Sequence, residues 1–155
     1  MSLSSDYGEL FKILNKHGVR YLVIGAYAVI YYTEPRFTKD LDIWVEAREK
    51  NATSLYKALK EFGAPLAKIR PRDFTNRKLI YQIGVDPIRI DIMMGLPGVR
   101  FNTAWRKRTR STYGDVPISI LGKKELVRSK RRIGRTQDLM DVERLTRRGG
   151  KRRKV

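Results

Sequence analysis

The spacing of hydrophobic and polar positions along the chain predicts a mixed α/β fold. Apolar residues recur every three or four positions in some stretches, and form short continuous or alternating runs in others, which are the patterns of helices and strands. The predicted helices cover 4–17, 26–32, 51–63, 117–132 and 136–148, and the predicted strands cover 20–25, 41–46, 78–84 and 88–95. The last two strands are expected to pair as a hairpin around Asp86-Pro87.

The order of these elements limits the architecture. The later strands have no crossover helix between them, so we expect an α/β (α+β) layer fold, with helices packed on a small mixed sheet, rather than a doubly wound sheet. The 155 residues suffice for one domain with a core. We expect a single domain over 1–148, with a core at 8–95 and a C-terminal helical part at 96–148, followed by a flexible basic tail at 149–155.

The net charge of the chain indicates what kind of partner it binds. Lys and Arg total 34 against 16 Asp and Glu, a net charge of +18, which indicates a polyanionic partner such as nucleic acid. The alternative is a heavily charged surface of the thermophilic kind, but such surfaces usually mix both signs. The segment 97–110, "PGVRFNTAWRKRTR", is basic and contains Phe101 and Trp105. With Tyr113, these rings are candidates for stacking on bases, although core packing is the better interpretation of Trp105.

Residue types that are missing or rare exclude several functions. The chain has no Cys, which excludes disulfides, thiolate metal sites and a Cys nucleophile. Its one histidine, His17, lies in an expected loop, so a His-based catalytic triad is disfavoured. No apolar run is long enough for a membrane span or a signal peptide, and we therefore expect a cytoplasmic protein with no membrane partner.

Three aspartates on predicted strands are the candidate catalytic residues. Asp40 and Asp42, in "RFTKDLDIWV", are two positions apart and therefore point to the same face of a strand. Asp91 lies in "IRIDIMM", on the face opposite to the isoleucines. Clustered acids repel each other unless cations lie between them, and oxygen-only ligands favour Mg²⁺ or Mn²⁺. If the two strands are neighbours, the three carboxylates converge on a site for two metal ions; an Asp-x-Asp pair alone also occurs by chance.

A strand-glycine-helix turn precedes these acids. In "YLVIGAYAVIYY", Gly25 allows close approach of a ligand to the backbone, and the N-terminus of the following helix offers free N–H groups to a phosphate. The simpler alternative is that Gly25 and Ala26 only end the strand and let the helix pack. Arg36 and Lys39 flank the acids and are candidates for phosphate contacts or solvated loop charges, while Thr38 either bonds the loop or begins the strand.

These motifs carry a family resemblance. The stretch "VRYLVIGAYAVIYYTEPRFTKDLDIWV" resembles the opening of the minimal nucleotidyltransferases of the polymerase β superfamily, in which Gly-[Gly/Ser] follows a strand, Asp-x-Asp lies on the next strand and a third Asp on a later one. The C-terminal "LVRSKRRIGRTQDLMDVERL" is similar to the subgroup related to abortive-infection (AbiEii-type) toxins. Two departures are Ala26, where the family has Gly or Ser, and Gln137, where the subgroup often has a basic residue.

The resemblance implies roles for the acids and the turn. Asp40 and Asp42 would bind both metal ions, and Asp91 would complete one metal site and help to activate the acceptor hydroxyl. Gly25 and Ala26 would contact the β- and γ-phosphates through their backbone N–H groups.

Further roles are implied for the C-terminal helices. Lys130 would bind the nucleotide phosphates, with support from Arg135, Asp138 and Asp141. Salt bridges between the two helices are the alternative for these supporting residues, and the better one for Asp141.

The implied function is Mg²⁺-dependent transfer of a nucleoside monophosphate from an NTP to an acceptor hydroxyl. The resemblance favours RNA, especially tRNA, as acceptor, and a toxin–antitoxin or phage-defence setting with a possible protein partner. Alternatives are a protein-AMPylating antitoxin, a catalytically silent nucleic-acid-binding module, and a metal-dependent nuclease. The nuclease is disfavoured because restriction-type sites usually place a Lys two residues after the strand acid, where this chain has Met93.

Overall fold

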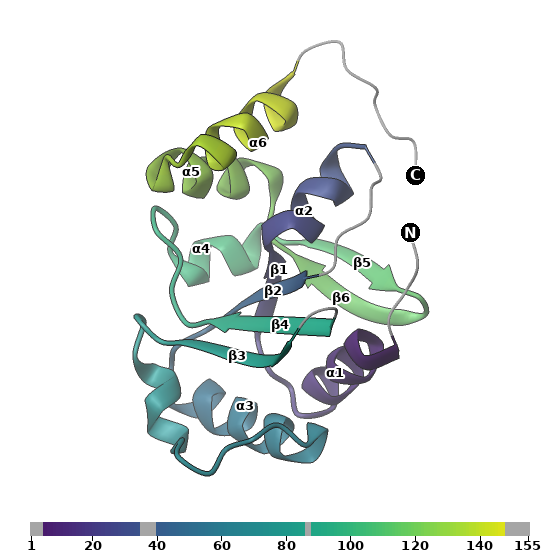
Figure 1. The fold of residues 1–155 in the computed structure, drawn as a ribbon, viewed down its shortest axis with the longest axis vertical. Helices are drawn as coiled ribbons and strands as arrows, with labels where there is room; N and C mark the ends of the chain where they lie inside the picture. The colour runs from purple at the N-terminus through teal and green to yellow at the C-terminus, as the bar shows by residue number, and fades with distance from the viewer. Residues whose placement is uncertain (1–4, 35–39, 86–87, 148–155) are drawn as a thin grey trace.

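A mixed six-stranded sheet forms the centre of the protein, with strand order β3-β4-β2-β1-β6-β5 (Figure 1). The computed structural model describes residues 5–34, 40–85 and 88–147. The strands are β1 (Tyr21–Ile24), β2 (Asp40–Val45), β3 (Ile80–Val85), β4 (Ile88–Met93), β5 (Thr109–Tyr113) and β6 (Val116–Ile120). The pairs β2–β4 and β1–β6 are parallel, and the other neighbours are antiparallel. The expected mixed α/β fold class is thereby confirmed.

Helices cover both faces of this sheet. They are α1 (Ser5–Lys16), α2 (Gly25–Tyr32), α3 (Glu49–Phe62), α4 (Phe101–Arg106), α5 (Lys123–Ile133) and α6 (Thr136–Thr146), with a 3₁₀ turn η1 (Pro71–Thr75). In Figure 1, α1 and α3 lie on one side of the sheet, whereas α2 and α4 lie on the other with the α5–α6 pair beyond them.

Strand β2 shows how sequence alternation divides the sheet into a core face and a polar face. Leu41 and Ile43 are completely buried, which is what the apolar half of the alternation predicts. Asp40 and Asp42 point the other way, toward the side of α2 and α4. Trp44 continues that face and packs edge-on against Phe101 of α4, with ring centroids 4.9 Å apart. The acids therefore lie on the face that the smaller helices leave partly open.

One sequence-based prediction was wrong in part. Residues 117–132 do not form one helix, because their first half is strand β6 and α5 begins at Lys123. The alternation of buried Ile118 and Ile120 with Pro117 and Ser119 is a strand pattern. A turn at Gly114, whose φ is +63°, joins β6 to β5 as a hairpin, and that strand and helix α4 were not predicted at all. The sheet consequently has six strands where four were expected.

The remaining elements agree with the sequence patterns. Strands β3 and β4 form the expected antiparallel pair, with the turn residues Asp86 and Pro87 outside the described part of the chain. Among the described residues, no helix combines the length and apolar character that a membrane span requires.

Candidate active site

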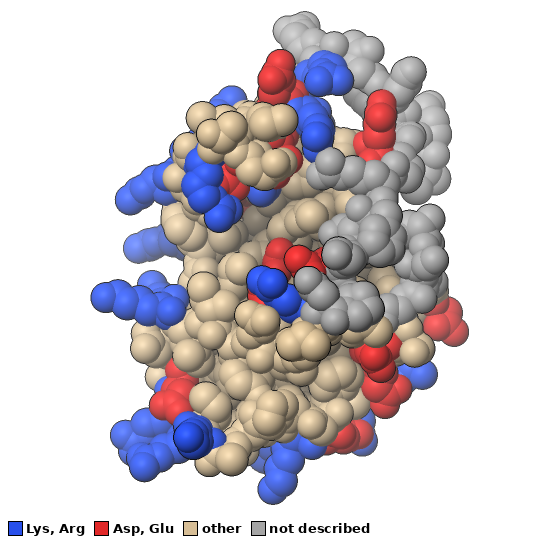
Figure 2. Space-filling view, viewed as in Figure 1, with Lys and Arg blue, Asp and Glu red and all other residues tan. Residues whose placement is uncertain are grey.

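Strand register brings the three aspartates to one place. Asp42 of β2 lies directly opposite Asp91 of β4, and Asp40 lies opposite Arg89. Because β2 and β4 are parallel, residues in register point to the same face of the sheet. Near the middle of the face drawn in Figure 2, acidic atoms lie with a basic side chain beside them, below the helical part at the top. Asp91 therefore lies next to Asp42, as the hypothesis of a three-aspartate site demands.

The neighbouring charges act on the pKa of Asp42. This pKa is raised to about 6, first by burial and then by the negative charges of Asp91 and Asp40. Arg89 and Lys130 act in the opposite direction on this pKa. Asp40 Oδ1 is buried without a hydrogen-bond partner among the described residues. Three clustered acids, one of them with an unsatisfied buried oxygen, form a site whose negative charge favours a cation.

An arginine compensates part of this negative charge. Arg89 lies two residues before Asp91 on the same face of β4, and its Nη2 and Nε contact the two carboxylate oxygens of Asp91 at 3.0 and 3.3 Å. Asp91 is 8% exposed, so this bidentate pair keeps a buried charge partnered. Tyr7 of α1 donates from its hydroxyl to the Arg89 carbonyl at 3.2 Å, which ties α1 to the same strand.

The three aspartates supply the oxygen ligands that a hard divalent cation prefers, with Asp91 paired to Arg89 in this structure. As the described residues stand, no three His, Cys, Asp or Glu side chains are gathered closely enough to hold a metal ion. The carboxylates themselves are suitable, because they are all oxygen ligands, share one face and include an unpartnered buried oxygen. Asp40, Asp42 and Asp91 are thus the residues that would hold Mg²⁺ or Mn²⁺, in competition with the Arg89 guanidinium.

Gly25 lies against these acids. Its φ of +71° is the left-handed conformation that glycine favours, and a Cβ built at this position would lie 2.2 Å from Asp42 Oδ2. The register agrees, since Ile24 pairs with Asp42. Helix α2 starts at Gly25, and the preceding Ile24 makes no side-chain cap to the N–H groups of the first turn, which are the groups that bind anions at a helix N-terminus. The glycine turn and the carboxylates therefore form one site, with Ala26 next to the turn.

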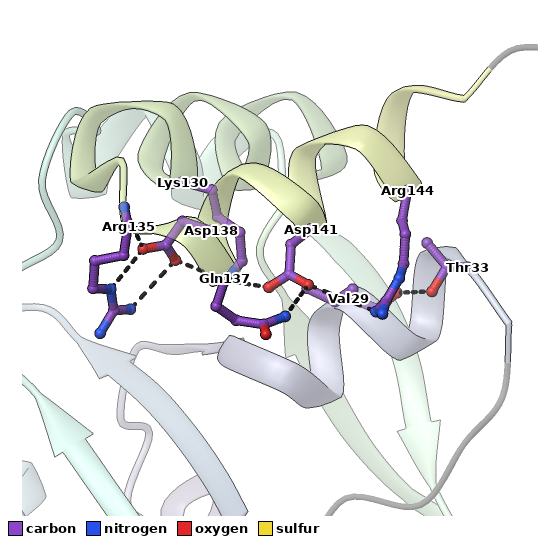
Figure 3. Close-up of polar contacts among 8 residues, drawn as sticks. All are labelled: Val29, Thr33, Lys130, Arg135, Gln137, Asp138, Asp141 and Arg144. Atoms are coloured by element: carbon purple, nitrogen blue, oxygen red, sulfur yellow. Dashed lines mark hydrogen bonds and ion pairs between the residues drawn. The ribbon is translucent and has the colours of Figure 1, made fainter.

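Lys130 of helix α5 points toward two acids of helix α6 (Figure 3). Its Nζ lies 3.0 Å from Asp141 Oδ2 and 3.3 Å from Asp138 Oδ1, and both acids are buried on α6. The charge of Lys130 acts to lower the pKa of Asp42, against the larger effect of burial. Two buried acids on α6 thus fix the position of an ammonium group whose charge acts on Asp42.

Arg135, Gln137 and Arg144 complete this network (Figure 3). Arg135 Nε contacts Asp138 Oδ2 at 2.6 Å, and Gln137 donates to Asp141 Oδ1 at 2.9 Å. Burial raises the pKa of Asp138, but Arg135 and Lys130 outweigh it and leave the pKa below its ordinary value. Gln137 adds a hydrogen bond to Asp141, which already pairs with Lys130 at 3.0 Å and with Arg144 at 3.7 Å, so Asp141 has partners without a basic residue at position 137.

Some predicted site residues are not placed here. Arg36, Thr38 and Lys39 lie outside the described residues, so their proposed phosphate contacts stay predictions. Tyr113 is buried and packs against Phe11, with ring centroids 5.4 Å apart, which removes it as a base-stacking residue.

Sequence reasoning missed the contribution of Arg89. The alternation in "IRIDIMM" already placed Arg89 and Asp91 on one face, and an arginine two residues from a buried acid on one strand is a signal for an ion pair.

Replacing Arg89 should strengthen metal binding. In Arg89→Gln, Asp91 loses its bidentate partner, so we expect the affinity for Mn²⁺ to rise several-fold while the metal-free protein loses roughly 1–2 kcal/mol of stability. Titration of free Mn²⁺ by electron paramagnetic resonance measures the first effect. Arg48→Gln is the matched control, because Arg48 pairs with buried Glu46 at 3.3 Å elsewhere. Unchanged or weaker Mn²⁺ binding in Arg89→Gln would show that Arg89 does not compete with the cation.

Solved structures share this fold. One is a lincomycin-bound structure of the lincosamide antibiotic adenylyltransferase LnuA, with 12% identity over 93% of this chain and 96% of that one and a TM-score of 0.56. A second is a Thermotoga maritima protein assigned as a nucleotidyltransferase, with 15% identity over 92% and 93% and a TM-score of 0.59. A third is an antigenic nucleotidyltransferase-like protein from Paracoccidioides brasiliensis, with 17% identity over 92% and 77% and a TM-score of 0.56.

No protein-family model and no curated protein sequence matches the chain. At these identities the structural likeness concerns the fold alone, and the fold is that of nucleotidyltransferases.

Proposed function

We propose that this chain is an NTP-dependent nucleotidyltransferase that moves a nucleoside monophosphate to an acceptor hydroxyl. The observation that carries the proposal is the contact of the Gly25 turn with Asp42, which itself lies opposite Asp91. The N-terminus of α2, where a phosphate would bind, thereby lies next to the carboxylate cluster, which suits phosphoryl chemistry. The fold shared with nucleotidyltransferases supports the same reaction class.

Each group of site residues would have a separate role in the transfer reaction. The acceptor oxygen would form a bond to the α-phosphorus, the bond from this phosphorus to the oxygen that bridges to the β-phosphate would break, and pyrophosphate would leave while the Asp91 carboxylate accepts the hydroxyl proton. The N–H groups at Gly25 and Ala26 hold the β- and γ-phosphates, and Lys130 neutralises charge on the departing pyrophosphate. Mg²⁺ or Mn²⁺, held by Asp40, Asp42 and Asp91, would supply acidification of the acceptor hydroxyl and charge neutralisation. Catalysis here is mainly positioning and charge stabilisation, which suits a chain of 155 residues.

RNA is the acceptor that the charge of the chain favours, with tRNA ends as the first candidates. The net charge of +18 suits a polyanion better than a neutral small molecule. A toxin–antitoxin or phage-defence role, with a protein partner or protein acceptor, belongs to the same hypothesis because it rests on the abortive-infection resemblance.

A small hydroxylated molecule is the second candidate acceptor. LnuA, whose structure holds lincomycin, matches 96% of its own chain to this one, so a chain of this size and fold suffices for an antibiotic adenylyltransferase. The two acceptor classes differ in whether the basic surface matters. An RNA acceptor should need its Lys and Arg side chains for binding, whereas a small antibiotic should not.

Transfer of label from each α-³²P NTP tests the proposal. The protein is incubated with Mg²⁺ and either total RNA or a panel of hydroxylated antibiotics, and Asp40→Asn is the inactive control. Label in RNA supports the first acceptor, and label in the antibiotic supports the second. RNA cleavage, or no label in RNA or in any antibiotic with any NTP, would contradict nucleotidyl transfer.

A further inference from the structure

Guanidinium groups gather around Trp105, away from the carboxylates. The Arg108 guanidinium lies 3.8 Å from the centre of the Trp105 ring, and that of Arg20 lies 5.4 Å from it. Arg108 Nη1 donates to the Trp105 carbonyl at 2.7 Å, which fixes its position. The indole itself stacks on Phe101, with ring centroids 5.8 Å apart. Trp105 is therefore a rigid support for arginines rather than a free surface for a base.

The arginines of this group lack acidic partners. Burial lowers the pKa of Arg108, and the nearby charges of Arg110 and Arg20 lower it further, which shows three like charges close together. In the described part of the chain, none of the three pairs with a carboxylate. Glu46 and Glu125, on neighbouring segments, pair with Arg48 at 3.3 Å and with Lys107 at 3.9 Å. Uncompensated guanidiniums that repel each other are stabilised by an external anion.

The surroundings extend this positive surface. Between Arg100 and Arg132 the sequence contains only two acids, Asp115 and Glu125, among many basic residues. Figure 2 shows basic side chains projecting along one edge of the molecule, on the side where α4 and α5 lie in Figure 1. A ligand carrying several regularly spaced negative charges fits such an edge better than a single phosphate does.

We propose that Arg108 and Arg20, which lie over the Trp105 ring, and the neighbouring Arg110 bind the phosphate groups of a single-stranded nucleic acid, the acceptor strand of the transfer reaction. The identification of the strand as acceptor rests on the proposed function. Guanidinium matches phosphate in geometry and charge, which is why arginine serves at phosphate sites. We call Arg20, Arg108 and Arg110 the guanidinium cluster.

Position on the sheet connects the guanidinium cluster to the carboxylates. Arg20 precedes β1 and shares the face of Leu22 and Ile24, because alternate residues of an extended chain point the same way. Ile24 lies opposite Asp42, so Arg20 is four residues, about 13 Å, from the carboxylate row along β1. A strand bound at the cluster would therefore have its end within a few nucleotides of Asp42.

Binding of a short fluorescein-labelled single-stranded RNA, followed by anisotropy over a series of NaCl concentrations, tests this site. Arg20→Gln/Arg110→Gln removes two exposed cations without touching the carboxylates. Each phosphate contact contributes a slope of about −0.7 to log K against log [salt] for a single strand, so the slope should fall in magnitude by about 1.4, with at least a five-fold loss of affinity at low salt. Single-stranded DNA of the same sequence should respond in the same way, because phosphates are the shared chemistry.

Lys12→Gln/Lys57→Gln is the matched control. It removes two exposed cations from α1 and α3, on the other side of the sheet, and should leave the slope nearly unchanged. Equal effects of both double variants, or equal displacement of the RNA by polyglutamate, would overturn the proposal. The assay contains neither NTP nor divalent cation, so its outcome is independent of whether the chain transfers nucleotides.

Discussion

Replacing Asp42 with asparagine is expected to abolish nucleotidyl transfer while stabilising the metal-free protein. Asp42 lies between Asp91 and the Gly25 turn, and a neutral amide there would weaken both cation binding and charge stabilisation of the transition state. An electrostatic contribution of about 4 kcal/mol corresponds to a loss of roughly a thousandfold in rate. Labelled transfer from the preferred NTP measures it, with Glu143→Gln, which removes an exposed carboxylate on α6, as control.

The stability gain has a definite pH dependence. The pKa of Asp42 is raised from 3.8 to about 6 in the folded protein, first by burial and then by Asp91 and Asp40. A raised folded pKa contributes stability that is fully present below the unfolded value, near pH 4, and is lost as the pH rises through about 6. Asp42→Asn should therefore match the wild type near pH 4 and exceed it by up to about 3 kcal/mol above pH 7.

Urea unfolding in EDTA at both pH values measures this difference. A variant that is destabilised at pH 7, or a difference that does not change with pH, would mean that Asp42 is not strained by its acidic neighbours.

Gly25→Ala is expected to have the second largest effect, on both folding and transfer. The new methyl group would lie 2.2 Å from Asp42 Oδ2 and 2.9 Å from its Cβ, so either β2 or the turn must move. The positive φ adds about 1–2 kcal/mol by itself. Because the first turn of α2 and Asp42 would separate, we expect at least a hundredfold loss of transfer even where the variant remains folded.

Gly18→Ala separates backbone strain from the clash. Gly18 has a φ of +67°, close to that of Gly25, but nothing lies within 4 Å of its added Cβ. Thermal unfolding and transfer assays on both variants should give a small stability loss and normal activity for Gly18→Ala. If Gly25→Ala behaves like Gly18→Ala in both assays, the glycine turn is not part of the active site.

The carboxylate face could be predicted from sequence, but its assembly could not. Alternation along β2 and β4 placed Asp40 with Asp42 and Arg89 with Asp91, since side-chain direction has period two. Whether Asp91 meets Asp42 depends on strand order. Either strand of the β3–β4 hairpin can pair with β2. Both strands contain apolar residues, so the sequence does not predict which of the two is the neighbour of β2. The sheet places β4 inside and β3 at the edge.

The C-terminal half shows a different limit. The segment "PISIL" runs without a break into the helical "GKKELVRSKRR". Because the turn at Gly114 was not recognised in the sequence, the hairpin that precedes this helix was not predicted. The pairing of Lys130 with Asp138 and Asp141 fits the salt bridges that the sequence suggested as an alternative. The effect of Lys130 on the pKa of Asp42 depends on how the α5–α6 pair packs against the sheet, which the spacing of residues along the chain does not specify.

The central claim is that Asp40, Asp42 and Asp91 jointly hold a divalent cation beside a nucleotide bound at the Gly25 turn. The most direct test is a crystal structure with Mn²⁺ and a non-hydrolysable ATP analogue, in which anomalous scattering locates the manganese. The account predicts peaks about 2.0–2.3 Å from oxygens of all three aspartates, with Arg89 turned away from Asp91 and the β- and γ-phosphates at the start of α2. A nucleotide bound elsewhere, or an Arg89–Asp91 pair that persists with no manganese between the aspartates, would contradict it.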